Sequence, residues 1–442
     1  MGLQISNAFA PGITIKSGIS PTGTYSISTN GLLDVTKYSS INVNVSDLLD
    51  IRLQSRLSMS IYENKNLTYV APYAFAFQGI SSFNLPNVKY IDEGAFWSAG
   101  CSNYYFPECE YIGKYAFSAQ ANPTLYTVNA PKVKIIDQGA FSSASAVAID
   151  FPECITISKY AFWSNYTSSI NLPKCQNIGA YAFAYCRYIT DLNLPACLQL
   201  ETNAFVSCTR LSQVTINNCI SLSSNVFAHC SSLATIFCNR IEELPSYAFY
   251  SLTALNSIMC NNVKIIGNTA FSGCNSLSYI NLPNCSEIGS LAFYYCPSLL
   301  SIDFGSYLQT IGSQAFRGCY SLTTVSIITN NSIVLGSYCF ANCSNLTQVL
   351  ISNCGFINGY AFSNCSNLQT VSLYGISSFY YQNIFWGCSK LQSLYLFVSS
   401  IPYIGNSGYF ASTPLSNSTY TGTFGSIYVP SSLYSAFITA NG

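Results

Sequence analysis

Apolar and polar residues alternate along this chain in a short pattern that returns every 21 to 25 residues. A phenylalanine, usually preceded by alanine, marks each return. It occupies 16 positions: Phe75, Phe96, Phe117, Phe141, Phe162, Phe183, Phe205, Phe227, Phe249, Phe271, Phe293, Phe316, Phe340, Phe362, Phe385 and Phe410. A recurrence at so narrow a spacing indicates stacked structural repeats rather than one ordinary globule.

A second apolar element keeps a constant phase with this phenylalanine. The segment 277–285 reads L-x-x-I-x-L-x-x-C, and the same frame begins at Ile189, Leu211 and Leu346. Its last two apolar residues flank one exposed residue, which predicts a strand with one buried face. The Ala-Phe segment predicts a turn that sends a second apolar pair inward. One repeat cannot bury its own apolar edge, but stacked repeats can.

These patterns predict a mainly β fold, a leucine-rich-repeat solenoid of about 16 rungs, where a rung is one repeat. We expect a parallel sheet on the concave face, short 3-10 or irregular turns opposite, and the phenylalanines as a buried spine. We also expect four segments along the chain. They are a small β module (1–47), a lead-in and N-terminal cap (48–70), the solenoid (71–420), and a C-terminal cap of a strand and a short helix (421–442).

The repeat string resembles a known family. Residues 266–277 read I-G-x-x-A-F-x-x-C-x-S-L without a break, and this string is similar to the BspA-like leucine-rich repeat. The resemblance implies a solenoid that binds host proteins, glycans or other cells. Residues 1–47 carry a hairpin signal at Asn30-Gly31. They resemble an N-terminal module of Gram-positive bacterial and phage tail-associated proteins.

Composition disfavours several classes of function. Only 8% of residues are charged, and 17 basic and 17 acidic side chains leave a net charge of zero. Such a chain lacks the basic face that nucleic acids require. No apolar run approaches the ~18 residues of a membrane span. We expect the cell surface, the extracellular space or a virion. Because no secretory signal is visible at the start, synthesis in the cytoplasm without classical export is the alternative.

The 20 cysteines follow the repeat as well. Nine lie three residues after a repeat phenylalanine, seven close the strand motif, and four occupy other internal slots. Small, weakly polar thiols suit buried columns, so we expect reduced structural thiols, with a bridge between stacked cysteines as the alternative. The single histidine, His229, stands in a variable slot, and no catalytic set or paired C-x-x-C unit is found. We therefore expect no metal, no cofactor and no enzyme activity.

The exposed column of the predicted strands is the candidate ligand-binding surface. Phe237 and Met259 are adjacent apolar residues in a column otherwise rich in amides and hydroxyls, which favours a partner patch. Inward-turned or scattered surface residues are the alternative, and the asparagines favour either glycan contacts or stabilising ladders. The candidate residues are Tyr105, Asn193, Thr215, Thr235, Phe237, Ser257, Met259 and Asn281.

The leading hypothesis is a non-enzymatic recognition or adhesion scaffold for a host or cell-surface protein or glycan. A phage tail or fibre component is one version of it. Neutral charge and many serines and asparagines favour association, so a self-assembling filament or spike, hence a homo-oligomer, is the alternative. Neither nucleic acid nor membrane insertion is expected.

Overall fold

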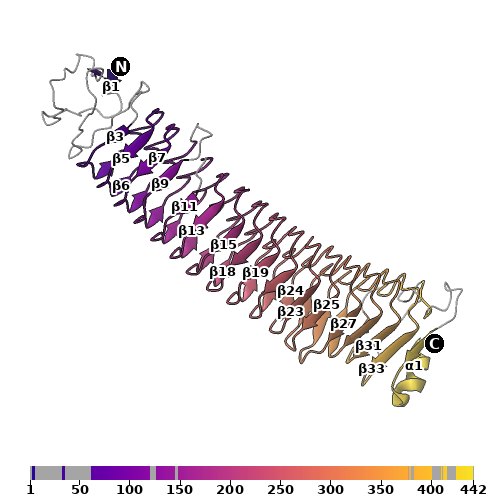
Figure 1. The fold of residues 1–442 in the computed structure, drawn as a ribbon. Helices are drawn as coiled ribbons and strands as arrows, with labels where there is room; N and C mark the ends of the chain where they lie inside the picture. The colour runs from indigo at the N-terminus through magenta and orange to yellow at the C-terminus, as the bar shows by residue number, and fades with distance from the viewer. Residues whose placement is uncertain are drawn as a thin grey trace. The chain divides into compact units, whose positions relative to one another are not determined.

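In a computed structural model of the chain, the described residues are 2–4, 32–34, 61–119, 126–144, 148–376, 378–379, 383–400, 410, 412–415 and 425–441. The chain divides into two compact units, unit 1 (residues 1–211) and unit 2 (residues 212–442). Each unit is a stack of rungs whose strands pair in parallel (Figure 1). The prediction of a parallel β-solenoid is confirmed.

In unit 1 every described rung contributes one three-residue strand and one two-residue strand. The three-residue strands are β3 (Ile61–Glu63), β5 (Ser82–Asn84), β7 (Asn103–Tyr105), β9 (Thr127–Asn129), β11 (Ala148–Asp150), β13 (Ser169–Asn171) and β15 (Asp191–Asn193). The two-residue strands are β4 (Tyr69–Val70), β6 (Tyr90–Ile91), β8 (Tyr111–Ile112), β10 (Ile135–Ile136), β12 (Thr156–Ile157), β14 (Asn177–Ile178) and β16 (Gln199–Leu200). The short strands form their own in-register ladder from β4 to β16.

Unit 2 repeats this plan with longer strands toward its C-terminal end. The first set is β17 (Gln213–Thr215), β19 (Thr235–Phe237), β21 (Ser257–Met259), β23 (Tyr279–Leu282), β25 (Ser301–Phe304), β27 (Thr324–Ile327), β29 (Gln348–Ile351), β31 (Thr370–Tyr374), β33 (Ser393–Phe397) and β34 (Ser426–Tyr428). The second set is β18 (Ser221–Leu222), β20 (Glu243–Leu244), β22 (Ile265–Ile266), β24 (Glu287–Ile288), β26 (Thr310–Ile311), β28 (Ile333–Leu335), β30 (Cys354–Ile357) and β32 (Ser378–Phe379). We call the exposed side of the first set, and of its counterpart in unit 1, the long-strand face.

All 16 repeat phenylalanines are buried. Their rings stack from rung to rung, with centroids 5.0–5.5 Å apart in unit 1. In unit 2 the distances are 4.9–6.2 Å. Stacking in a water-free interior adds aromatic contact energy to the burial of the rings. The predicted spine is present in both units.

The turns that carry this spine are more regular than predicted. The backbone adopts a left-handed conformation two residues before and two residues after the phenylalanine, as at Tyr160 and Ser164 around Phe162. This shape lets the phenylalanine N–H donate to the carbonyl that precedes the next phenylalanine. The distance is 2.7–2.8 Å in unit 1 and 2.7–3.0 Å in unit 2. The side opposite the long strands is therefore a hydrogen-bonded ladder of short strands and turns.

The cysteine columns also lie inside. All 20 cysteines are buried and free of disulfide bonds. Thiols that follow the phenylalanine bond the carbonyl of the phenylalanine on the preceding rung, for example Cys186 Sγ to the Phe162 oxygen at 3.0 Å. Thiols that close the strand motif bond a carbonyl two residues on, as Cys219 does to Ser221 at 3.3 Å. Many of these thiols therefore have a hydrogen-bond acceptor without a bridge.

The chain ends are described only in part. Near the N-terminus β1 (Gly2–Gln4) pairs antiparallel with β2 (Leu32–Asp34), and the rest of the predicted 1–47 module, its turn included, lies outside the described residues. Residues 61–70 supply β3 and β4, the first described strands of the two ladders. After β34 come a 3-10 turn, η2 (Ser431–Leu433), and α1 (Tyr434–Asn441), whose Phe437 is buried. The four segment boundaries stay a prediction.

Candidate functional site

Phe237 and Met259 lie side by side on the long-strand face of unit 2. Strands β19 and β21 pair in register, with Phe237 opposite Met259 and Thr235 opposite Ser257. The Met259 side chain is 48% exposed and Phe237 is half-buried, whereas Ile236, between the two columns, is fully buried. The two side chains are therefore directed to the surface, against the alternative that they turn inward.

The structure brings most of the other candidates close to this pair. Thr215 on β17 is in register with Phe237, and Asn281 on β23, the next long strand after β21, is half-buried. We call Thr215, Thr235, Phe237, Ser257, Met259 and Asn281 the β19–β21 patch. Apolar side chains with hydroxyl and amide neighbours on a sheet suit contact with a partner molecule.

Tyr105 and Asn193 lie in unit 1 and are described apart from this patch. Tyr105 on β7 is 45% exposed and pairs with Asn84 and Asn129 of the neighbouring strands. In the same column the Asn171 amide donates to the Asp150 carboxylate at 2.8 Å. Rung-to-rung bonds of this kind support the ladder interpretation for this part of the asparagine column.

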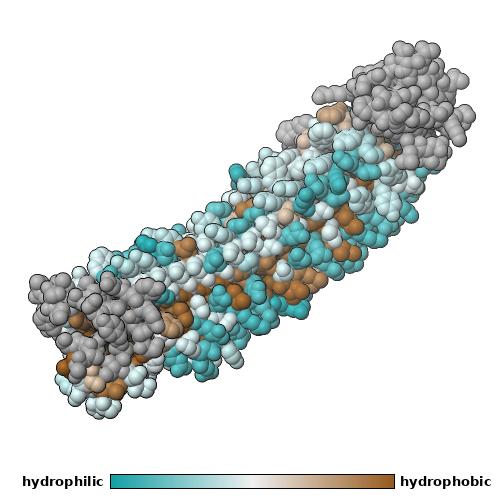
Figure 2. Space-filling view, turned by 180° about the vertical axis from the view of Figure 1, so that it is seen from behind, coloured by the Kyte–Doolittle hydropathy of each residue, from teal (hydrophilic) through white to brown (hydrophobic). Residues whose placement is uncertain are grey.

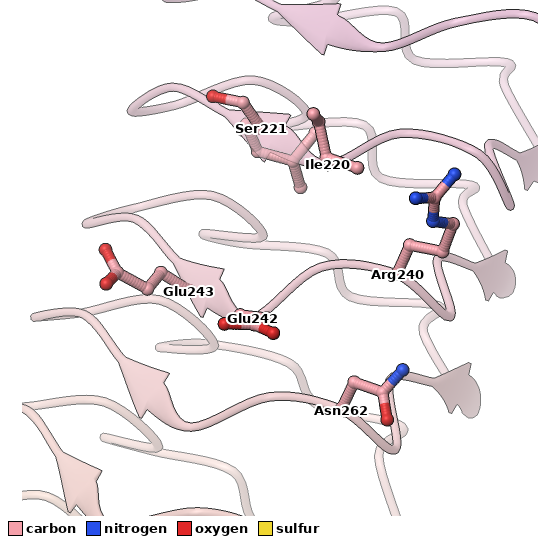
Figure 3. A pocket seen from close by; sticks show the side chains of 7 residues that line it. Ile220, Ser221, Arg240, Glu242, Glu243 and Asn262 are labelled. Carbon is pink, nitrogen blue, oxygen red and sulfur yellow. The ribbon is translucent and has the colours of Figure 1, made fainter.

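A polar groove, absent from the sequence prediction, lies in unit 2 where each rung passes from its long strand to its short strand. One hollow of about 500 Å³ is lined by Ile220, Ser221, Leu222, Arg240, Glu242, Glu243 and Asn262 (Figure 3). A second of about 410 Å³ is lined by Glu242, Asn262, Lys264, Asn284, Ser286, Tyr307 and Gln309. Because Glu242 and Asn262 line both hollows, the two are neighbours, and together their lining residues extend over five rungs. We call them the rung groove.

Hydrogen bonds fix part of the lining of the rung groove. The amide of Asn262 donates to the Asn239 carbonyl at 2.7 Å, and that of Asn284 donates to the Asn261 carbonyl at 2.9 Å. Lys264 Nζ lies 2.8 Å from a Glu242 carboxylate oxygen. These contacts position four of the lining side chains: Asn262, Asn284, Lys264 and Glu242.

Arg240 interrupts this pattern. It occupies the slot that Asn262 and Asn284 fill on the next rungs, and its guanidinium extends toward the rung of Ile220 (Figure 3). Within the described part of unit 2, the side chains of Arg240 and Glu243 have no hydrogen-bond or ion-pair partner, whereas Lys264 bonds Glu242. The groove thus offers one unpaired cation and one unpaired carboxylate.

Sequence reasoning missed the rung groove because it read each repeat along the chain. The lining residues stand 20 or more positions apart and become neighbours only when the rungs are written beneath one another. In that alignment Asn218, Arg240, Asn262, Asn284 and Tyr307 share one slot, and Arg240 is the charged exception. This signal was present in the sequence.

The buried thiols differ in their pKa values. Burial raises the pKa of Cys186, Cys296 and Cys354 to about 12, which keeps these thiols protonated and weakly nucleophilic. Over the described ranges, no group of three or more histidine, cysteine or acidic side chains is placed to hold a metal ion. No helix found there has the length and apolar character needed to cross a bilayer.

The exposed surface is mixed in character. On the face drawn in Figure 2, hydrophobic residues lie in small groups and narrow bands bordered by hydrophilic ones. Small apolar groups with polar borders are typical of soluble surfaces and of modest contact sites. The apolar part of the β19–β21 patch, two side chains wide, fits that scale.

Comparison with known proteins agrees with this architecture. A leucine-rich repeat protein from Bacteroides ovatus matches with a TM-score of 0.50 and 18% identity over 84% of this chain and 92% of that one. A leucine rich cell surface protein from Faecalibacterium prausnitzii matches with a TM-score of 0.37 and 21% identity over 72% and 83%. The pneumococcal vaccine antigen PcpA gives 0.36 and 15% over 85% and 82%. At 18% identity the likeness to the Bacteroides ovatus protein concerns the fold alone.

Matches of the sequence to other sequences and to family models are more direct evidence of family membership than the structural matches. No curated protein matches the chain. The phage-tail resemblance of the N-terminal segment finds no support in these comparisons. The family model for the BspA type leucine-rich repeat region matches six times, over residues 6–124, 51–167, 110–234, 155–260, 242–369 and 326–435. Together these matches span most of the sequence, and the chain belongs to the BspA type leucine-rich-repeat family.

Proposed function

We propose that this protein is a non-enzymatic binding scaffold that contacts a host or cell-surface partner through the β19–β21 patch. The observation that carries the proposal is the exposed pair of Phe237 and Met259, held side by side in register on a parallel sheet. Aromatic and methionine side chains are enriched at protein interfaces, and a few such anchors supply most of the binding energy.

The scaffold beneath the patch is preorganised. Ile236 and Cys238, which flank Phe237 along the chain, are fully buried, and the Cys238 N–H donates to the Met259 carbonyl at 3.1 Å. A surface fixed in this way loses little conformational entropy when a partner binds. Rigidity of the backbone together with variation of the exposed slots suits recognition better than catalysis.

The proposal places the protein at a cell surface, outside the cell or on a virion, where it would meet such partners. A phage tail or fibre component is the narrowest version. Self-assembly into a filament is the competing function, favoured by the zero net charge and by exposed tyrosines such as Tyr307 and Tyr279. Light scattering over a concentration series tests it, and a monomer at high concentration contradicts it.

Binding to cultured cells and to immobilised surface proteins tests the patch. F237S and M259S should each weaken binding by about tenfold or more, because each removes an apolar anchor. I328S is the matched control, since Ile328 is 63% exposed in unit 2 and lies outside the patch. Unchanged binding by both patch variants, with thermal unfolding like that of the wild type, would refute the proposal.

A further inference from the structure

The rung groove has a repeat distance, and this distance restricts its ligand. Its lining slots recur once per rung, and in-register parallel strands place successive rungs ~4.8 Å apart. That step is close to the length of one pyranose residue in an extended chain of β-linked sugars. An extended polypeptide advances ~3.3 Å per residue and repeats its side-chain direction every second residue, so it falls out of step with the rungs.

The charges in the groove balance. Arg240 and Lys264 oppose Glu242 and Glu243, and the remaining polar lining consists of neutral amides and hydroxyls. A strongly charged ligand would find as much repulsion as attraction there. A neutral ligand with many hydroxyl groups would find both acceptors and donors, which is what hydroxyls need, because each one donates one hydrogen bond and accepts others.

Apolar surface stands at both ends of the groove. Ile220 is 55% exposed at one end, and Tyr307 is 56% exposed at the other. The negative face of a tyrosine ring attracts weakly positive C–H groups, and one face of a β-linked pyranose presents several of them. Polar groups between two apolar ends match a sugar chain that lies lengthwise.

We propose that the rung groove binds a neutral, extended oligosaccharide of about four or five sugars, one to each rung. This inference rests on the proposed function as a binding scaffold and adds a second contact surface to it. Arg240 and Glu243, the unpaired charged side chains of the groove, hydrogen-bond the sugar hydroxyls. The fixed amides of Asn262 and Asn284 accept or donate to the next sugars along the groove.

A panel of immobilised neutral and charged oligosaccharides, followed by calorimetry with the best binders, tests this proposal. The probes include chain-length series of β-linked glucose and N-acetylglucosamine, a galacturonic acid tetramer, and a neutral peptide of serine, glycine and asparagine. Affinity should increase with each added sugar up to four or five and then level off. The acidic tetramer and the peptide should bind at least about tenfold more weakly.

Variants localise the binding. R240A and E243Q should each weaken oligosaccharide binding by about tenfold, because each removes a charge-assisted hydrogen bond. K132A is the control, since Lys132 occupies the slot of Arg240 in unit 1. R240N tests the slot with a side chain that the neighbouring rungs already accept, so a folding defect is not expected. Loss of binding in R240A and R240N with retention in K132A supports the proposal.

Several results would overturn it: no neutral oligosaccharide binds, the acidic tetramer or the peptide binds better, or R240A and E243Q bind like the wild type. These outcomes leave the proposed function separately testable. If the groove proposal fails and the proposed function holds, cell binding still depends on Phe237 and Met259. If cell binding instead survives F237S and M259S but is lost in R240A, the patch proposal fails and the groove proposal stands.

Discussion

The passage from long strand to short strand is built alike in the two units, yet its surface differs. In unit 1, lysines pair with glutamates in the same slot of the preceding rung: Lys132 with Glu108 at 2.6 Å, Lys134 with Glu110 at 2.7 Å, and Lys174 with Glu153 at 2.7 Å. Among its described residues, unit 2 has one such pair, Lys264 with Glu242, beside the unpaired Arg240 and the rung groove. One backbone can therefore carry either closed charge pairs or open hydrogen-bonding groups.

This comparison assumes that the interiors of the two units are equally stable. Replacing a buried phenylalanine with alanine in each unit tests this assumption with the largest expected effect. F162A in unit 1 and F293A in unit 2 each remove a fully buried ring that stacks on both neighbours. Each should lower the free energy of unfolding by about 3–5 kcal/mol, because it leaves a cavity that the rigid ladder cannot close. Urea unfolding measures this. A large cost in only one unit would mean that the interiors differ.

The units should differ in their response to alkali. Thirteen of the 20 cysteines lie in unit 2 and seven in unit 1. Burial raises the pKa of Cys186 and Cys296 from 9.0 to about 12, so above pH 9 the unfolded chain loses thiol protons that the folded chain keeps. Stability is full below pH 9 and falls progressively up to pH 12.

Hydrogen exchange at pH 8 to 10.5 in reducing buffer reports this loss for each unit. Unit 2 should lose protection at lower pH than unit 1. C296A is the control, because it should make the decline in unit 2 shallower. Equal protection in both units throughout this range would contradict the expectation.

The left-handed turn positions give an effect of intermediate size. At Gly139 in unit 1, with φ +62°, an added Cβ would lie 2.4 Å from Tyr115 Cε1. G139A should therefore destabilise the protein by about 1–2 kcal/mol. At Thr269 in unit 2, with φ +62°, T269G should stabilise by less than about 1 kcal/mol, because a β-branched residue is strained there. Thermal unfolding checks both, and changes of equal sign would show that strain does not control these turns.

The surface pairs should matter least for stability. E153Q in unit 1 and E242Q in unit 2 each break an exposed lysine–glutamate pair. Each should change the free energy of unfolding by less than about 1 kcal/mol, since water and salt screen exposed charges. Urea unfolding at low and high salt measures it. A larger cost for E242Q alone would show that the rung groove contributes to the stability of the fold.

Most of the interior could be predicted from the sequence. Burial leaves a strict repeating pattern of apolar residues. The buried positions of the repeat phenylalanines, of strand residues such as Ile236 and of the cysteines could therefore be predicted from this period. The neighbours Phe237 and Met259 could be predicted too, since equal spacing places equal slots side by side. Their role as a contact surface remains a proposal.

Other features leave weaker traces. The short-strand ladder was expected as irregular turns, because a segment of two residues such as Glu287–Ile288 is too short to show alternation. The left-handed turn residues include Tyr181 and Leu291, which no turn rule selects. Tyr105 and Asn193 share a column of the sequence pattern with the patch residues and lie in unit 1, and their role stays a prediction. The rung groove depends on the side chains of five rungs at once.

The donation from each phenylalanine N–H to the following rung runs in one direction only, and this has a genetic consequence. Within each unit, the rungs for which this bond is described receive it from the rung before and give it to the rung after in the same way. A segment of coding sequence one repeat long could be duplicated or lost, and the new junction would join surfaces that already fit. Length can then change by recombination while the exposed slots change by point substitution, so reach and specificity are free to evolve independently.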